Sequence, residues 1–106
     1  MTTKNEKLLQ RVKDTVLAFD AHAKVVLYGS RARGDAAPDS DWDFLVLLSI
    51  PVNSETKASL IRQLYDVELE TGEVISTIIH SKSKWETPLM KAMPFHENVT
   101  REGIAV

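Results

Sequence analysis

Residues 27–48 read LYGSRARGDAAPDSDWDFLVLL, and this stretch decides the fold. The run at 24–28 (KVVLY) is β-branched and aromatic and stops at Gly29, which predicts a strand. Residues 42–49 predict a second strand. The unbroken apolar run at 45–48 indicates that the far end of this strand is buried on both faces.

Apolar periodicity predicts the other elements outward from this stretch. Leu8, Val12 and Val16 recur at four-residue steps, which is typical of an amphipathic helix. We expect, in chain order, a helix at 4–20, a strand at 24–28, a helical turn at 30–34, a loop at 35–40, a strand at 42–49, a helix at 55–69, a strand at 73–80, a short helix at 84–92 and a last helix ending at Gly103. This order predicts a small sheet with helices packed against it. No repeat or linker divides the sequence, so we expect a single domain over residues 1–106.

Composition excludes several classes of protein. The 106 residues include no Cys, which rules out a disulfide framework and a thiolate zinc site and fits a reducing, cytoplasmic location. No apolar run approaches the roughly 18 residues of a membrane helix, so we expect no membrane association. Thirteen basic and fifteen acidic residues give a net charge of −2, which argues against general nucleic-acid binding.

Gly29 and Ser30 follow the first strand and precede a possible helical turn. Glycine allows a ligand to approach the backbone closely, and N–H groups at a helix start favour an anion such as phosphate. The Ser30 hydroxyl would add another donor. Taken alone, a Gly-Ser pair after a strand is more often only a turn.

Asp41 and Asp43 give the stronger signal. Residues two apart in a strand point to the same side, about 6–7 Å apart, so two carboxylates placed this way can share Mg²⁺. Two such metals would stabilise the attacking and leaving oxygens of an in-line phosphoryl displacement. Trp42 and Phe44 would then face the core. The alternative is that Asp41 only ends the loop while Asp43 pairs with a nearby arginine.

The combination of these motifs resembles the nucleotidyltransferases of the DNA polymerase β-like superfamily, and in particular their minimal, single-domain members of the antitoxin type. The matching positions are Gly29, Ser30, Arg33, Gly34, Ser40, Asp41 and Asp43, followed by the apolar strand at 44–48. The resemblance covers most of the chain. It implies an α+β (two-layer α/β) nucleotidyltransferase fold with a small mixed β-sheet and helices packed on it.

The resemblance also implies functional roles. Gly29, Ser30, Arg33 and Ser40 would bind the nucleotide, and Asp41 and Asp43 would be catalytic ligands of a two-metal Mg²⁺ site. A nucleoside monophosphate, AMP from ATP in the leading case, would pass to a hydroxyl group. The superfamily's catalytic core takes up about this whole chain, so we expect the acceptor to lie on a partner. A helical HEPN-type protein of a toxin–antitoxin pair is the first candidate partner, and a homo-oligomer is the second.

One position departs from the family pattern. Active members carry a third carboxylate on a later strand, but the centre of residues 73–80 (EVISTIIH) offers none. We expect Glu73 to supply it as metal ligand or general base if the strand begins early enough; Glu70 lies just before it. Otherwise the chain is a catalytically impaired module that acts by binding nucleotide or a partner protein. Transfer to a small molecule such as an aminoglycoside is a weaker alternative, because no second domain remains to hold one.

Overall fold

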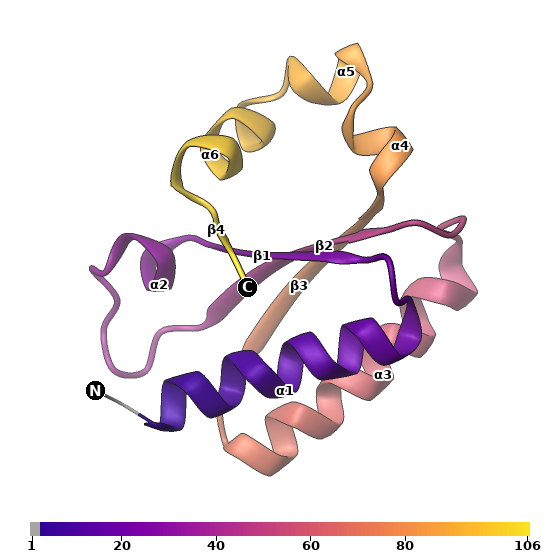
Figure 1. The fold of residues 1–106 in the computed structure, drawn as a ribbon. Coiled ribbons are helices and arrows are strands. Elements are labelled where there is room, and N and C mark those ends of the chain that lie inside the picture. The colour runs from indigo at the N-terminus through magenta and orange to yellow at the C-terminus, as the bar shows by residue number, and fades with distance from the viewer. Residues whose placement is uncertain (1–2) are drawn as a thin grey trace.

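The computed structural model describes residues 3–106 of the protein (Figure 1). The helices are α1 (Thr3–Phe19), α2 (Ser30–Arg33), α3 (Ser54–Thr71), α4 (Lys82–Trp85), α5 (Pro88–Lys91) and α6 (Pro94–Glu102). The strands are β1 (Lys24–Tyr28), β2 (Trp42–Leu48), β3 (Ile75–Ser81) and β4 (Ile104–Ala105). The predicted order of helices and strands is therefore confirmed, except that α4 and α5 replace one expected helix and a strand is added at the end.

Over residues 3–106 the strands form one four-stranded sheet in the order β3-β2-β1-β4. Strand β1 runs antiparallel to both β2 and β4, whereas β2 and β3 are parallel. A parallel pair needs a crossover connection, and α3 supplies it between β2 and β3. The mixed α+β sheet implied by the family resemblance is confirmed.

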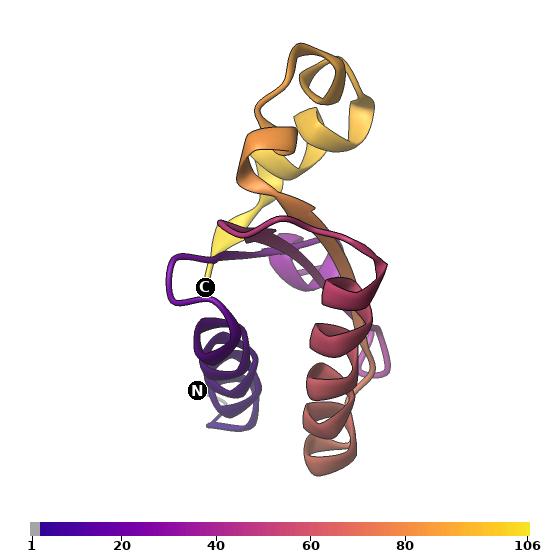
Figure 2. The same cartoon turned by 90° about the vertical axis from the view of Figure 1, so that its right-hand side faces the viewer.

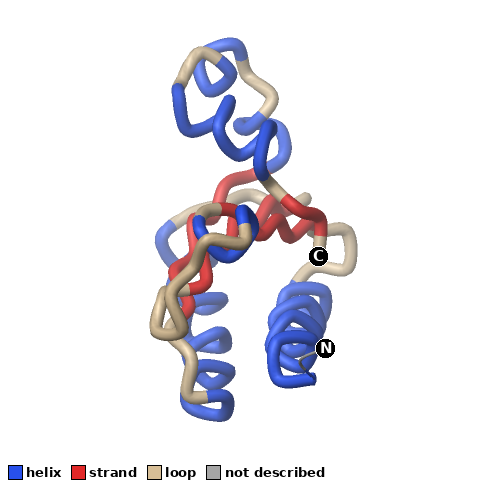
Figure 3. Tube along the Cα trace, turned by 90° about the vertical axis from the view of Figure 1, so that its left-hand side faces the viewer, coloured by secondary structure: helices blue, strands red, loops and turns tan. Residues whose placement is uncertain are grey.

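Helices cover both faces of the sheet. Helices α1 and α3 lie together against one face, and the short helices α4, α5 and α6 lie on the other (Figure 2). The same two layers are visible from the opposite side, with the strands between them (Figure 3). Central strand β2 is consequently buried on both sides from Phe44 to Leu48, as its apolar run predicts.

Alternate residues of β2 belong to two different apolar clusters. The even-numbered residues pack with α1 and α3 in the larger cluster, whose β2 members are Trp42, Phe44, Val46 and Leu48. Leu45 and Leu47 pack in the smaller cluster with Trp85, Met90 and Val99. This alternation fixes the side of the sheet on which Asp43 lies, because it shares the parity of Leu45.

Two predicted boundaries are wrong, and one strand was not predicted. Strand β3 begins at Ile75 rather than at residue 73. The short helix expected at 84–92 is two separate turns, because Thr87 caps a new helix that starts at Pro88. The last helix is followed by β4, a strand of only two residues that no sequence periodicity would reveal.

Gly103 allows β4 to lie this close to β1. A Cβ atom at Gly103 would be 2.5 Å from the Val99 carbonyl oxygen and 2.6 Å from Val26 Cγ1. The chain end therefore returns to the sheet through a position where only glycine fits.

Among the described helices, none combines the length and the apolar character needed to span a bilayer.

Asp20 ties the α1–β1 turn to the end of β2. Its buried carboxylate accepts hydrogen bonds from Ser49 N (2.6 Å), Ser49 Oγ (2.7 Å) and His22 N (3.1 Å). Burial by itself would raise the pKa of Asp20, but the hydrogen bonds from Ser49 and His22 together outweigh burial and leave this pKa below its ordinary value. The ionised carboxylate is thus part of the native structure.

We predict that Asp20→Asn lowers the free energy of unfolding by about 1–3 kcal/mol at neutral pH, since one buried N–H or O–H donor loses its acceptor. A carboxylate with a lowered native pKa stabilises the fold above its unfolded pKa, and this contribution is lost as the pH falls through the native pKa. The difference between wild type and variant in urea unfolding should therefore shrink below about pH 4.

Asp14→Asn is the matched control, because among residues 3–106 this exposed carboxylate accepts a hydrogen bond from Gln10 alone. It should change the unfolding free energy little at any pH. Equal effects of the two variants would contradict the role assigned to Asp20.

Candidate functional site

The turn after β1 is built on Gly29. This residue has φ 77° and ψ −159° and caps the start of α2, and its carbonyl oxygen accepts from the N–H groups of Ala32 and Arg33. Gly34, with φ 84°, ends the same helix and donates to the Ser30 carbonyl oxygen. Both positive φ values favour glycine, so the predicted strand–turn–helix arrangement is confirmed.

The Asp pair lies at the start of β2, beside this turn. In the strand register, Asp43 is paired with Tyr28 on β1 and with Ser76 on β3. Asp43 is half-buried on the α4–α6 side of the sheet, and Asp41 is exposed just before the strand. Trp42 is buried in the opposite cluster, as the predicted alternation requires.

The carboxylate of Asp43 lies directly against the backbone of Gly29. A Cβ atom built on Gly29 would be 2.5 Å from Asp43 Oδ2, a distance that real contacts do not reach. Glycine is therefore required here twice, once for its φ and once for the space that the carboxylate occupies. The two motifs that the sequence places fourteen residues apart, at Gly29 and Asp43, are in contact in the fold.

The electrostatics of the pair favour a cation. Burial raises the pKa of Asp43, the neighbouring Asp41 charge raises it further, and the Arg33 charge lowers it in part. Within residues 3–106, neither aspartate side chain forms a hydrogen bond or an ion pair. The alternative in which Asp43 pairs with Arg31 or Arg33 is thus not what the structure contains. Two adjacent carboxylates without a partner are oxygen ligands of the kind that Mg²⁺ prefers.

The position beside Asp43 on β3 is Ser76. Because parallel strands in register point their paired side chains to the same side, Ser76 stands where a third carboxylate would face Asp43. We expect Glu73 to supply this carboxylate if the strand begins early enough to include it. Strand β3 begins two residues after Glu73, so this condition is not met. Glu70 pairs instead with Arg11 of α1 at 2.7 Å. Among residues 3–106, no three His, Asp or Glu side chains gather closely enough to hold a metal.

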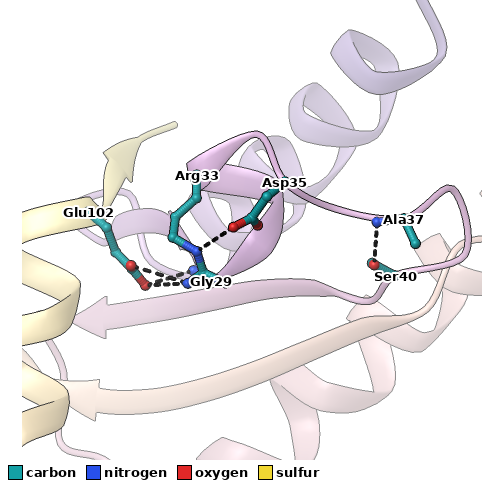
Figure 4. A network of polar contacts seen from close by, with 6 residues as sticks. All are labelled: Gly29, Arg33, Asp35, Ala37, Ser40 and Glu102. Carbon is teal, nitrogen blue, oxygen red and sulfur yellow. Dashed lines mark hydrogen bonds and ion pairs between the residues drawn. The ribbon is translucent and has the colours of Figure 1, made fainter.

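The remaining predicted nucleotide-binding residues are engaged in different ways. Arg33 pairs with Asp35 (3.2 Å) and with Glu102 (3.2 Å), as Figure 4 shows. The Ser40 hydroxyl accepts from the Ala37 N–H at 2.9 Å and so holds the loop before β2 (Figure 4). The Ser30 hydroxyl makes no hydrogen bond with the other residues that the structure describes.

Arg31 has a positioning role that the sequence did not reveal. Its guanidinium donates to the carbonyl oxygens of Pro38 (3.1 Å) and Ser40 (3.0 Å) and lies 4.4 Å from the centre of the Trp42 ring. It thus binds the acidic loop through backbone carbonyls and an aromatic face rather than through a carboxylate. No local signal distinguishes this from the phosphate contact or the ion pair that the sequence also allows.

Glu102 is the second residue that sequence reasoning missed. It lies 73 residues after Gly29, yet its Oε1 accepts the Gly29 N–H at 3.2 Å. Only the pairing of β4 with β1 brings the end of α6 to this turn.

Comparison of the sequence with models of protein families agrees with the fold and the site. The family model described as "Nucleotidyltransferase domain" matches residues 6–101. The chain belongs to the nucleotidyltransferase domain family. Gly29, Ser30, Arg33, Asp41 and Asp43 lie within the matched range, and Glu102 lies one residue beyond it.

A solved structure has the same fold as this nucleotidyltransferase domain. It is described as "Crystal structure of the toxin-antitoxin with AMP-PNP", and its TM-score is 0.59 at 15% sequence identity. The match covers 98% of the present chain and 72% of the other. At this identity the likeness establishes the fold alone. No curated protein matches the chain.

We predict that Gly29→Ala destabilises the domain by about 1–3 kcal/mol, because a side chain at positive φ is strained and its Cβ also displaces Asp43. Gly34→Ala is the matched control: it has a similar φ, but nothing lies within 4 Å of its Cβ. It should cost about 1 kcal/mol from backbone strain alone. Equal losses in urea unfolding would contradict the contact between Gly29 and Asp43.

We also predict that Arg31→Lys lowers the free energy of unfolding by about 1 kcal/mol. Lysine has no planar guanidinium that can donate to two carbonyl oxygens while it stacks on the Trp42 ring. Backbone amides of residues 35–41 should exchange hydrogen faster in this variant. Arg62→Lys, at an exposed position of α3, serves as the control. Unchanged exchange in residues 35–41 would show that Arg31 does not hold the loop.

Proposed function

We propose that the protein is a Mg²⁺-dependent nucleotidyltransferase that transfers AMP from ATP to a hydroxyl group on a partner protein. The observation that carries this proposal is the contact between the Asp43 carboxylate and the Gly29 turn. A pair of acidic ligands beside a glycine turn can hold a metal and a phosphate chain next to each other. ATP as the donor fits a cytoplasmic location.

The proposed roles follow from the positions of the side chains. The backbone of Gly29 and the hydroxyl of Ser30 would bind the triphosphate, with Arg33 supplying positive charge. Asp41 and Asp43 would hold Mg²⁺, because neither carboxylate has a hydrogen bond or ion pair among the described residues and Asp43 is half-buried. When bound, Mg²⁺ would neutralise charge on the phosphate oxygens. Ser40 would act through the loop that it braces with Ala37, next to Asp41.

The proposed reaction is a substitution at the α-phosphorus of ATP. The acceptor oxygen forms a bond to this phosphorus, the bond from phosphorus to the β-phosphate oxygen breaks, and pyrophosphate leaves with the electron pair. The hydroxyl proton passes to a base. The third carboxylate of active relatives has no counterpart at Ser76, so Glu73, after movement of the chain before β3, or a group of the partner would accept this proton.

The acceptor is proposed to be a protein because the related solved structure is described as a toxin–antitoxin complex with AMP-PNP. We propose a helical HEPN-type toxin as the partner of the present chain, which would make the chain its antitoxin. A second copy of this chain is the other possible acceptor, and self-labelling in the assay below would identify it.

A second function has a specific observation in its favour. The position beside Asp43 on β3 is Ser76, so it provides no carboxylate to complete a three-acid site. No such cluster forms elsewhere in residues 3–106. A module that binds nucleotide or its partner without turnover would keep the Gly29 turn and the Asp pair and would not need the third acid.

We predict that Asp43→Asn lowers transfer of label from α-labelled ATP to the proposed HEPN-type partner by at least about 100-fold, since a metal ligand is lost. Asp39→Asn is the matched control, because it removes one charge from the exposed loop of the same acidic stretch. It should leave transfer within about twofold, a change of less than 0.5 kcal/mol in barrier.

The two candidate functions give different results in this assay. Transfer that is lost only in Asp43→Asn supports the enzyme. Nucleotide or partner binding without transfer by the wild type supports the binding module, and Ser76→Asp then tests whether the missing acid is the cause. Absence of nucleotide binding, of partner binding and of transfer together contradicts both proposals.

A further inference from the structure

The Glu102 carboxylate occupies the turn at Gly29. Its Oε1 accepts the Gly29 N–H at 3.2 Å, and Arg33 Nη1 donates to Oε1 and Oε2 at 3.3 and 3.2 Å (Figure 4). The Glu102 side chain is only 17% exposed, whereas the Asp35 carboxylate that shares Arg33 is 61% exposed. A backbone N–H and a guanidinium therefore converge on one sheltered carboxylate.

Gly29 and Arg33 are also the donors that the proposed function assigns to a phosphate of the nucleotide. Carboxylate and phosphate oxygens accept the same charge-assisted hydrogen bonds, so one group excludes the other. We propose that Glu102 is an internal anion that occupies the phosphate position and must withdraw before a nucleotide binds. This inference rests on the proposed function, because it concerns the regulation of that same site.

The surrounding charges favour an exchange of anions. Asp43 lies against Gly29, so its carboxylate adds negative charge beside the turn, and Arg33 supplies positive charge there. A triphosphate and Glu102 together would place several negative charges around one guanidinium, which is unfavourable. Replacement of Glu102 by phosphate keeps Arg33 paired and sends the carboxylate to solvent.

The backbone that carries Glu102 is held in place. Val99 is buried on the preceding turn of α6, and Gly103 leaves no room for a Cβ atom between Val99 and Val26. The next two residues pair with β1, Ile104 with Leu27 and Ala105 with Val26. The movement that frees the turn is therefore a rotation of the Glu102 side chain, with α6 and β4 still attached to the sheet.

The test measures nucleotide binding by titration calorimetry with a non-hydrolysable ATP analogue and Mg²⁺. Glu102→Gln keeps an oxygen acceptor for Gly29 but removes the charge that Arg33 holds. If the turn is open about one tenth of the time in the wild type, the dissociation constant should fall about tenfold in this variant. Inorganic tripolyphosphate should show the same gain, since it carries the phosphates without base or ribose.

Glu97→Gln is the matched control on the same helix. Within the described part of the chain its exposed carboxylate pairs only with Arg101, at 3.9 Å, so its loss should leave binding unchanged. Glu102→Asp provides a second variant that keeps the charge and shortens the side chain by one methylene. It should also bind the analogue more tightly, because the shorter carboxylate cannot hold both contacts. Thermal unfolding of each variant verifies that it is folded.

The outcomes separate the two proposals. Tighter binding of both ligands by Glu102→Gln, with Glu97→Gln unchanged, supports the internal anion. Equal or weaker binding by the folded Glu102 variants overturns it and leaves the proposed function standing, since the wild type still binds. No binding by the wild type or by any variant overturns both the inference and the proposed function.

Discussion

The close approach of Asp43 to the backbone of Gly29 is the contact on which the candidate site depends. It exists because β1 and β2 pair antiparallel, which sets the end of one strand beside the beginning of the other. The approach leaves no room for any side chain at Gly29, and the φ of that residue independently excludes most others. A glycine turn and an acidic pair thereby become one surface, although a helical turn and a loop separate them in the chain.

The acidic stretch folds although, among the described residues, an ion pair compensates only one of its aspartates, Asp35. Residues 35–43 contain four aspartates, yet Arg31 binds carbonyl oxygens and the Trp42 ring instead of a carboxylate. Arg33 reaches only the outermost acid, Asp35, and Glu102. The loop is therefore ordered by groups that leave the charge of Asp41 and Asp43 in place. That uncompensated charge is a cost to stability and the feature that makes the site suitable for a cation.

The C-terminal segment has two roles in this arrangement. Its apolar residues cover the side of β2 that Leu45 and Leu47 present, and they complete the second core cluster. Its last helical residue, Glu102, reaches the turn at Gly29 from the opposite end of the chain. The same segment thus buries one face of the sheet and places Glu102 at the turn.

The sequence by itself determined the elements and the chemistry of the motif. Apolar periodicity locates α1, α3 and the strands, and the Gly-Ser and Asp-x-Asp spacing points to a phosphate beside a metal. Those signals are local, because they depend on side-chain alternation and on the φ that glycine permits. Only the tertiary structure decided the register that sets Ser76 rather than Glu73 beside Asp43, and the return of Glu102 to Gly29. The strand register and the position of Glu102 both depend on pairing between segments that are distant in the sequence. Strand β4 has two residues and is too short for a local sequence pattern to predict it.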